Sequence, residues 1–541
     1  MEQQDLNKRL ILALVLSFFV FVGYSYLFPP APQQPAEQNT HAKTPAVASP
    51  ETPNASAQAS VTVATAQKNS APVTTSNAKV LATITSNVFN MNIDQFGRIS
   101  EYELLQEKYK NEQGKNLHII AADKVKPLEI RFSDTTLNEE AFKVPYVNSG
   151  KSNIDLGSSG EETITLTQKL SSVTVTKKIT IKATGAYDID ISTSSPVPYF
   201  VTPGHRPMAD TSMYMLVRGA LVKGADDVVL TVEDGDAKGD EVVKNAKFTS
   251  AFDRYAASMF YNFEKGLNVS ILKQEGDNPL IFVEGNQDLH MGGYIGPKQY
   301  DILEKINPEL TDTIEFGFFT FLSRPFFKVL LWINDHVGNW GWAIILFTLL
   351  VKLILFPLSY KGMMSMQKLK DLAPKMKDIK EKYKGDPAKM NAQMMEMYKK
   401  NGANPMGGCL PMLLQIPVFF ALYRVLLNAD ELQGAVWIHG WIENLAIADP
   451  YYILPVLMGV SMWFQQKITP NNFTDPLQEK IFQWFPVIMA GMFIIMPFPS
   501  GLVLYWVVNN IFTIGQQYVI NAAYKKHKAA AVAAHHKGKE S

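Results

Sequence analysis

One apolar run with a single charge inside it constrains this chain more than any other feature. Residues 341–358 read GWAIILFTLLVKLILFPL, close to the roughly 20 apolar residues that cross a bilayer as a helix. Lys352 lies inside the run, and placing a lysine in hydrocarbon costs roughly 2.5–3.5 kcal/mol on insertion scales, so such a residue usually faces a wet or paired interior. The alternative is that its flexible stem carries the ammonium group to the nearest headgroups. The run predicts a membrane helix, and the rest of the chain must decide what its lysine faces.

Charge and cysteine content narrow the class of protein. The chain has 541 residues, with 51 basic and 51 acidic side chains, and a net charge of zero does not suggest a dedicated nucleic-acid binder. The length favours several domains. Because Cys409 is the single cysteine, no internal disulfide can form, and any exported domain must be held together by burial of its core.

The first 28 residues predict an uncleaved membrane anchor. Lys8 and Arg9 precede an apolar run that ends in the aromatic residues Tyr24, Tyr26 and Phe28, which suit a membrane interface. The alternative, a cleaved signal peptide, would normally have a shorter apolar core and a small-residue cleavage site. The following segment, 29–80, is rich in Pro, Ala, Gln, Ser and Thr and predicts a disordered linker.

Residues 81–317 predict a large external β-sandwich. Apolar and polar residues alternate over 173–176, 179–182 and 187–191, with many β-branched side chains, as strands require. We find no metal-ligand spacing in this region, and a sugar-type site stays open by fold analogy only. The next segment, 318–339, predicts an amphipathic helix that lies in the membrane interface on the external side. Its alternative is the last helix of the sandwich domain.

Lysine placement predicts the membrane topology. The segment 361–404 carries many more lysines than acidic residues, as cytoplasmic loops do, whereas 430–450 has acidic residues but no lysine or arginine and is expected outside. The sequence thus predicts a multi-domain membrane protein with an α-helical core of six spans and both termini in the cytoplasm. After the anchor, the predicted parts are transmembrane helices 340–360, 405–429, 451–468, 481–497 and 501–521, the cytoplasmic loop 469–480 and the basic cytoplasmic tail 522–541.

The segment 361–404 predicts a helical hairpin. Gly385, Asp386 and Pro387 can end one helix, cap the next and occupy its first turn. Both predicted helices are rich in methionine, which is flexible and polarizable and suits surfaces that meet varied apolar partners. The alternative is that these methionines only seal the seam of the hairpin.

Several predicted spans carry polar residues that lipid does not tolerate. In the last span Asn509, Thr513 and Gln517 share one helical face. Together with polar residues of other spans they can line a water-containing cavity, whereas the alternative is interhelical hydrogen bonding worth about 0.6 kcal/mol per contact. Because the sequence shows no ATP-binding loop, metal cluster or nucleophile with its base, we expect no cofactor and no enzymatic reaction. A transporter often shows an inverted repeat, and we see none.

Five long motifs carry a resemblance to a known family. They are VKLILFPLS (351–359), NPMGGCLPMLLQIPVFFALY (404–423), DPYYILPVLMG (449–459), TDPLQEKI (474–481) and FPSGLVLYWVVNN (498–510). In this order, and with the hairpin between the first two, they resemble the YidC/Oxa family of membrane protein insertases in its Gram-negative form, which has a large periplasmic domain. The resemblance is close from about residue 320 onward and looser before it.

The resemblance implies a groove that works without nucleotide hydrolysis. Five of the six spans form an insertase core around a hydrophilic groove that is open to the cytoplasm and to lipid. A basic residue in the groove attracts the polar or acidic external segment of a nascent chain, whose apolar segment then moves into lipid. The residues expected to line the groove are Lys352, Thr348, Gln415, Tyr505, Trp506, Asn509 and Thr513.

Two of these positions depart from the family pattern. Lys352 stands where the family usually has arginine, which keeps the charge but loses the bidentate fork of a guanidinium group. Trp506 replaces the usual second tyrosine of an aromatic pair, so a hydroxyl group is lost.

The resemblance also implies partners and a location. The hairpin and the loop 469–480 are expected to receive substrates, and for the hairpin we assign this role to Met366, Leu369, Met376, Met390 and Met394. The basic tail is expected to help contact ribosomes, although such a tail can equally bind anionic lipid. The implied partners are therefore nascent membrane proteins, the Sec translocon, the ribosome and membrane lipids, at the bacterial inner membrane.

Overall fold

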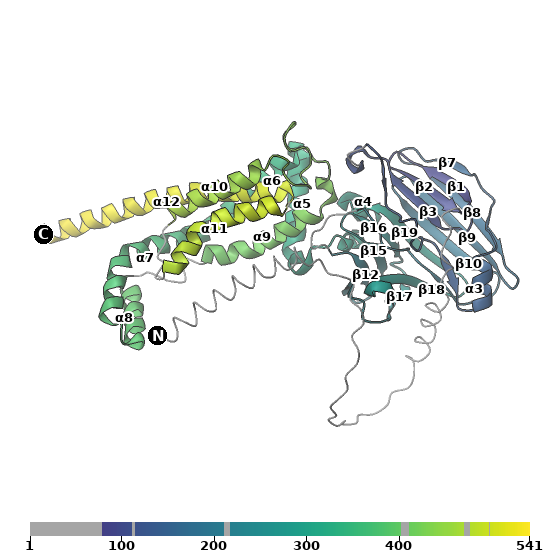
Figure 1. Ribbon diagram of the computed structural model, residues 1–541, viewed down its shortest axis with the longest axis horizontal. Helices are drawn as coiled ribbons and strands as arrows, with labels where there is room; N and C mark the ends of the chain where they lie inside the picture. The colour runs from purple at the N-terminus through teal and green to yellow at the C-terminus, as the bar shows by residue number, and fades with distance from the viewer. Residues whose placement is uncertain are drawn as a thin grey trace, which may run out of the picture.

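A computed structural model of the chain describes residues 78–110, 114–209, 217–401, 410–469, 476–496 and 498–540. The predicted anchor 1–28 and nearly all of the linker 29–80 lie outside the described residues, as does half of the loop 469–480. Within these ranges the molecule has two parts, a β-sheet domain and a bundle of helices, which follow one another along the longest axis (Figure 1).

The β-sheet domain contains one nine-stranded and two five-stranded sheets. In spatial order the nine-stranded sheet consists of β13 (Val229–Glu233), β12 (Gly219–Lys223), β15 (Phe248–Phe252), β16 (Ala256–Tyr261), β19 (Leu289–Pro297), β10 (Ala186–Thr193), β9 (Thr174–Lys182), β8 (Glu161–Lys169) and β6 (Val147–Asn148). One five-stranded sheet has the order β4 (Leu117–His118), β3 (Ile99–Leu104), β2 (Phe89–Asp94), β1 (Val80–Thr85) and β7 (Asn153–Asp155). The other has the order β14 (Glu241–Ala246), β17 (Leu267–Lys273), β18 (Pro279–Gly285), β11 (Tyr199–Val201) and β5 (Ile130–Phe132).

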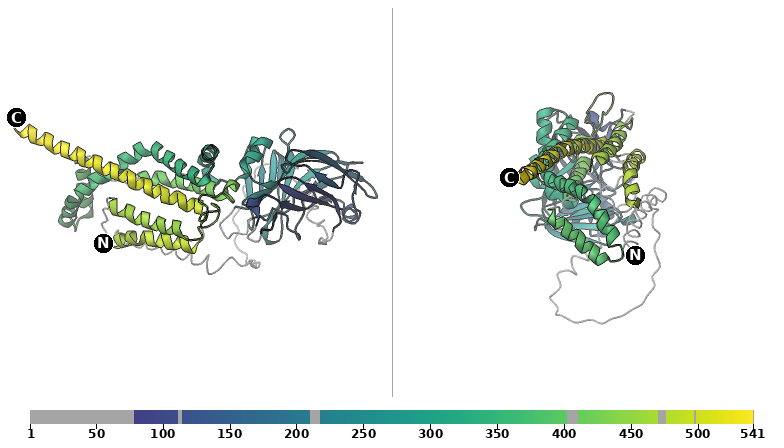
Figure 2. Two further views of the ribbon diagram at one scale, coloured as in Figure 1. Left: turned by 90° about the horizontal axis from the view of Figure 1, so that it is seen from above. Right: turned by 90° about the vertical axis from the view of Figure 1, so that its left-hand side faces the viewer.

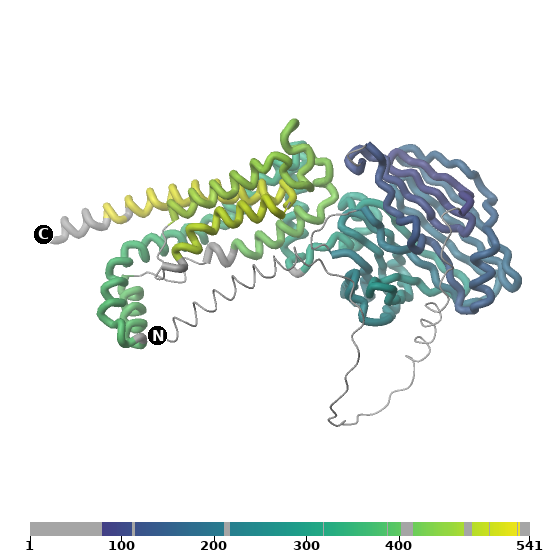
Figure 3. Tube along the Cα trace, in the orientation of Figure 1, coloured from purple at the N-terminus to yellow at the C-terminus, as the bar shows by residue number. Residues whose placement is uncertain are grey.

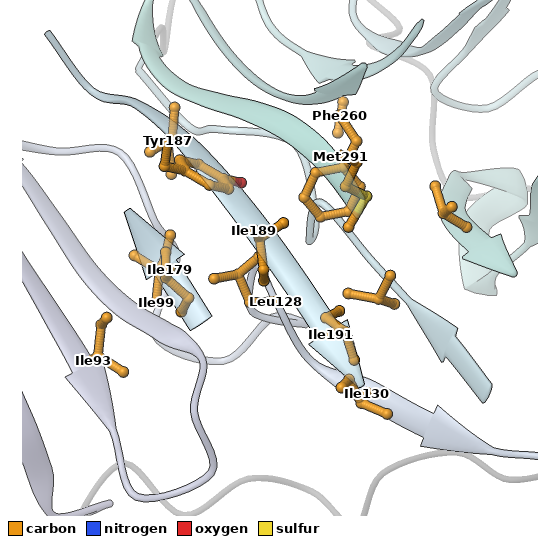
Figure 4. Close-up of a cluster of buried hydrophobic side chains, with 14 of the residues drawn as sticks. Ile93, Ile99, Leu128, Ile130, Ile179, Tyr187, Ile189, Ile191, Phe260 and Met291 are labelled. Carbon is orange, nitrogen blue, oxygen red and sulfur yellow. The ribbon is translucent and has the colours of Figure 1, made fainter. Parts of the chain in front are cut away.

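One continuous hydrophobic core joins the three sheets. Ile93 and Ile99 come from the first five-stranded sheet, Ile130 from the second, and Ile179 and Ile189 from the nine-stranded sheet, and all five are buried in one cluster (Figure 4). The alternating pattern predicted over 173–191 corresponds to β9 and β10, whose buried residues alternate with more exposed ones. The predicted strands in this stretch are therefore confirmed.

Part of the nine-stranded sheet is buried on both faces. In β15, Ala251 belongs to the core between the sheets, whereas Phe248 and Phe252 belong to a second cluster on the opposite face. That second cluster includes Leu303 of α4 (Tyr300–Ile306), Phe327 of α5 (Thr320–Val337) and apolar residues of the helical bundle. A continuous apolar core therefore connects the sheet domain to the helices.

The helical part begins with α5, which lies in the segment predicted as an amphipathic helix, 318–339. The helices that follow are α6 (Trp340–Ile354), α7 (Phe356–Lys382), α8 (Pro387–Lys400), α9 (Leu410–Asn428), α10 (Ile453–Ile468), α11 (Pro476–Ile495) and α12 (Ser500–Glu540). The predicted last span and the predicted tail form one helix, α12, which extends well beyond the bundle (Figure 2).

The apolar run 341–358 is not one uninterrupted helix, which corrects the expectation from the sequence. The helix breaks at Leu355, and α6 and α7 meet there at an angle of 65°. Pro357 lies in the first turn of α7, where its missing N–H group would interrupt a continuing helix. Within the described ranges no single helix is long and apolar enough to cross a membrane by itself, although the bent pair α6–α7 is by length and composition.

The hairpin of α7 and α8 lies at the end of the bundle farthest from the sheets (Figure 3). As predicted, Asp386 caps α8, since its side chain accepts a hydrogen bond from the backbone of Lys389, and Pro387 follows in the first turn. Leu369, Leu372 and Tyr398 form the buried seam between the two helices.

The connection between α9 and α10 packs against the sheet domain. Asp430 is fully buried, and its Oδ2 accepts hydrogen bonds from Lys108 Nζ at 2.7 Å and from the Tyr109 hydroxyl at 2.6 Å. Next to it, Glu431 Oε1 accepts a hydrogen bond from the backbone N–H of Tyr300 at 2.8 Å. These contacts fix the end of the bundle nearest the sheets to the sheet domain.

Candidate functional site

Lys352 lies at the meeting point of three helices. Its Nζ donates to Thr513 Oγ1 of α12 at 2.9 Å and lies 3.4 Å from Gln415 Oε1 of α9. Both acceptors are neutral, and in the described part of the chain no carboxylate pairs with this ammonium group. The side chain is half-buried, in the last turn of α6. Among the residues that the structure describes, the partners of this positive charge are therefore neutral.

Gln415 extends this contact into a short polar network. While its Oε1 faces Lys352, its Nε2 donates to the hydroxyl of Tyr505 at 2.8 Å. On the other side of the lysine, Thr513 Oγ1 donates to the carbonyl oxygen of Asn509 at 2.7 Å. Of the residues expected to line the groove, five are thus linked through hydrogen bonds.

Two expected groove residues make other contacts. The hydroxyl of Thr348 donates to the carbonyl oxygen of Ile344 in its own helix at 2.7 Å, and its side chain is buried. Trp506 packs edge-on against Phe419 and Phe493, with ring centroids 4.9 and 5.4 Å away. Trp506 therefore contributes to an aromatic wall beside the polar network rather than to the network itself.

One atom in the site is buried and unsatisfied. The Oδ1 of Asn509 has no hydrogen-bond partner among the residues that the structure describes. A buried amide oxygen without a partner is destabilising by about 1–3 kcal/mol, so a water molecule or a polar substrate group is the natural partner for this atom.

Further polar residues continue the network along α12. Gln516 Nε2 donates to the carbonyl oxygen of Lys352 at 3.3 Å, and Gln517 Nε2 donates to Asn521 Oδ1 at 2.6 Å. Gln367 of α7 donates to the same Asn521 oxygen. The sequence expectation did not include Gln367 and Asn521, although Thr513, Gln517 and Asn521 recur at intervals of four residues and this spacing could have pointed to Asn521.

Most of the hairpin residues expected to receive substrates lie in the seam. Leu369 is buried there, and Met366, Met376 and Met394 pack against the same cluster, whereas Met390 is half-buried and outside it. The geometry of these side chains therefore fits the interpretation that the methionines seal the hairpin, while their role toward a substrate stays a prediction.

Large apolar side chains point outward around the bundle. Val460 of α10, Trp484 of α11 and Ile354 of α6 expose 57%, 63% and 67% of their surface, and they are part of a wider set of exposed apolar residues on these helices. Extensive exposed apolar surface marks a face that contacts protein or lipid. The polar network therefore lies inside a bundle whose outer surface is apolar.

Two family profiles match the chain. The profile described as "60Kd inner membrane protein" matches residues 332–528, which include every residue of the polar network. The profile described as "YidC periplasmic domain" matches residues 252–329.

Curated relatives match almost the whole chain. A protein from Campylobacter jejuni named "Membrane protein insertase YidC" is 48% identical over 96% of this chain and 97% of its own length. Proteins of the same name from Wolinella succinogenes and Helicobacter pylori are 46% and 44% identical, and each alignment covers 98% of both chains. On this nearly full-length similarity, the chain belongs to the YidC family of membrane protein insertases.

Proposed function

We propose that the network around Lys352 is the substrate groove through which this insertase places nascent membrane proteins in the inner membrane. The observation that carries the proposal is the half-buried ammonium group, whose partners in the described ranges are the neutral side chains of Gln415 and Thr513. A carboxylate from a substrate can replace Gln415 or Thr513 as its partner, and a charge-assisted hydrogen bond is roughly twice as strong as a neutral one.

The surroundings of the network favour transfer of a polar segment past lipid. The open acceptor on Asn509 and the amide of Gln415 provide neutral hydrogen-bonding groups for a hydrated polypeptide. The apolar exterior offers the apolar segment of the substrate a direct route into hydrocarbon. Burial of that segment is the downhill step, so the cycle requires no nucleotide.

The proposed topology places the sheet domain in the periplasm and the hairpin in the cytoplasm. It has six spans with both termini in the cytoplasm, and five of the spans form the core. Two features support it: the acidic connection at Asp430 packs on the sheet domain, and the lysine-rich hairpin lies at the opposite end of the bundle. The bent pair α6–α7 then crosses the membrane with its break near the cytoplasmic side.

Cooperation with other machinery is part of the proposal. The family suggests that the protein works alone or with the Sec translocon, and that the basic end of α12 contacts the ribosome or anionic lipid. The groove can be tested without either partner in a purified system.

The experiment reconstitutes the full chain into liposomes and measures protease protection of a single-span substrate with a short acidic external tail. We expect wild type to insert the substrate and Lys352→Ala to lower insertion about tenfold, the effect of one lost interaction of about 1.4 kcal/mol. Lys361→Ala, which removes an exposed lysine in α7, is the matched control and should insert normally. Equal insertion by Lys352→Ala and wild type would exclude the charge as the active feature, and no insertion by folded wild type would contradict the function.

A further inference from the structure

The polar face of α12 continues beyond the groove and holds the hairpin. Asn521, Tyr524 and Lys528 follow one another at intervals of three and four residues and so lie on one side of the helix. On α7, Gln367 and Asp371 are four residues apart and face them. We call these five residues the α7–α12 contact.

The α7–α12 contact has a buried and an exposed half. In the buried half, Gln367 donates to Asn521. In the exposed half, Asp371 Oδ2 accepts hydrogen bonds from the Tyr524 hydroxyl at 2.9 Å and from Lys528 Nζ at 2.6 Å. The side chains of Asp371 and Lys528 are 39% and 59% exposed. The hydrogen bond from Lys528 lowers the pKa of Asp371, so the carboxylate stays charged and the exposed half acts as an ion pair.

The geometry of the α6–α7 joint makes this contact important for the hairpin. Because the chain bends by 65° at Leu355, the direction of α7 is not set by continuation of α6. α8 packs on α7 through Leu369, Leu372 and Tyr398, so the two helices form one packed unit. The joint and the α7–α12 contact together determine where the hairpin lies relative to the groove.

We propose that Asp371 is a positioning residue for insertion: through Tyr524 and Lys528 it holds the hairpin beside the end of α12, next to the groove. An exposed ion pair is weak and is screened by salt, so this half of the contact can open while the buried half holds. When it opens, α7 beyond Gln367 and the packed helix α8 can move away from α12. The role in insertion rests on the proposed function, whereas the effect on hairpin position does not.

The test measures the position of the hairpin directly. Spin labels at Lys382→Cys in α7 and Lys525→Cys in α12, in a Cys409→Ser background, report the distance between the helices by pulsed electron paramagnetic resonance. We expect a narrow distance distribution for the parent protein and a broader one for Asp371→Asn. Asp378→Asn, the same change at an exposed position of α7, is the matched control and should match the parent. The double variant Asp371→Lys with Lys528→Asp should restore most of the narrow distribution.

The same variants, without labels, are then compared in the liposome assay. Asp371→Asn should lower the insertion rate roughly two- to fivefold, the range expected for one exposed ion pair, and the charge-swapped double variant should recover it. An unchanged distance distribution in Asp371→Asn overturns the proposed contact. A changed distribution with a normal insertion rate overturns its role in insertion. Failure of wild type to insert contradicts the proposed function and leaves the distance result as an independent test of the contact.

Discussion

Two lysines, one in each part of the molecule, show how the same side chain can have different surroundings. In the sheet domain Lys177 is fully buried and donates to the carbonyl oxygens of Gly97 at 2.9 Å and Leu128 at 2.7 Å. Its ammonium group also lies 4.8 Å from the ring centroid of Tyr146. In the bundle Lys352 is half-buried and faces two neutral side chains.

The difference lies in the partners. Because backbone carbonyl groups are fixed in place, Lys177 is held between two segments that are far apart in the sequence. Burial lowers the pKa of Lys177 to about 7. The side chains of Gln415 and Thr513 can rotate, so the ammonium group of Lys352 can exchange them for a new partner. The contacts of Lys177 therefore stabilise the fold, whereas we propose that Lys352, with neutral side-chain partners, is available to a substrate.

The largest effect on stability is expected for Lys177→Met. It leaves two buried carbonyl oxygens unpaired, and with about 1–3 kcal/mol for an unsatisfied group we expect a loss of about 2–4 kcal/mol. Hydrogen exchange of the β9 and β10 amides in the full chain measures this opening free energy. Lys178→Met, on the exposed face of the same strand, is the control and should change it by less than about 0.5 kcal/mol. Equal effects of the two substitutions would contradict the claim that the buried hydrogen bonds of Lys177 stabilise the sheet domain.

A smaller effect on stability is expected where Asp430 and Glu431 pack on the sheet domain, and this effect depends on pH. Burial, and then the neighbouring charge of Asp430, raises the pKa of Glu431 to about 7. The docked state therefore holds a proton that the free carboxyl group, with a pKa near 4.3, releases, so the junction is most stable at low pH and weakens as the pH rises through 7. Of the other groups that face it, Lys108 and the Tyr109 hydroxyl both bond to Asp430, and Tyr300 donates its backbone N–H to Glu431.

Hydrogen exchange at the Tyr300 amide, corrected for the intrinsic pH dependence, measures this effect. Between pH 6 and pH 8 we expect protection to fall by about 1–2 kcal/mol. Glu431→Gln carries no proton that titrates and should show a flat profile. A wild-type profile as flat as that of the variant would rule out the proton-linked junction.

The smallest effect is expected for Tyr505→Phe, which removes the hydroxyl that accepts from Gln415. If the groove admits water, a water molecule replaces the lost partner, and the change in stability stays below about 0.5–1 kcal/mol. Thermal unfolding of the purified protein measures it, and Tyr423→Phe, in the same bundle, controls for general loss of a hydroxyl. A loss as large as that of Lys177→Met would show that the groove is as dry as the sheet core.

Sequence patterns revealed strands only where one face is exposed. β9 and β10 alternate, because their outer face meets solvent. β15 is buried at all five positions, since its second face packs against helices, so no alternation marks it. Contacts between distant elements, such as Asp430 with Lys108, leave no local pattern.

The site, like the fold, was predictable from the sequence in part. A charge in an apolar run pointed to Lys352, polar residues at helical spacing pointed to Thr513, and the family resemblance pointed to Gln415. The structure brings these three residues together. Thr348 lies four residues before Lys352, on the same face of the helix. Its hydroxyl donates within its own helix, and residue spacing cannot reveal that contact. The break at Leu355 depends on how Pro357 is accommodated, and the apolar pattern of 341–358 revealed neither the position of the break nor its angle.

Charge reversal tests the central claim most directly, namely that Lys352 recognises the external segment of a substrate by its charge. Two single-span substrates that differ only in the tail, one with acidic and one with basic residues, are inserted by wild type and by Lys352→Glu in liposomes of neutral lipid. We predict that wild type favours the acidic tail and that Lys352→Glu reverses the preference. An unchanged preference in the variant would contradict the charged groove and assign its function to hydration alone.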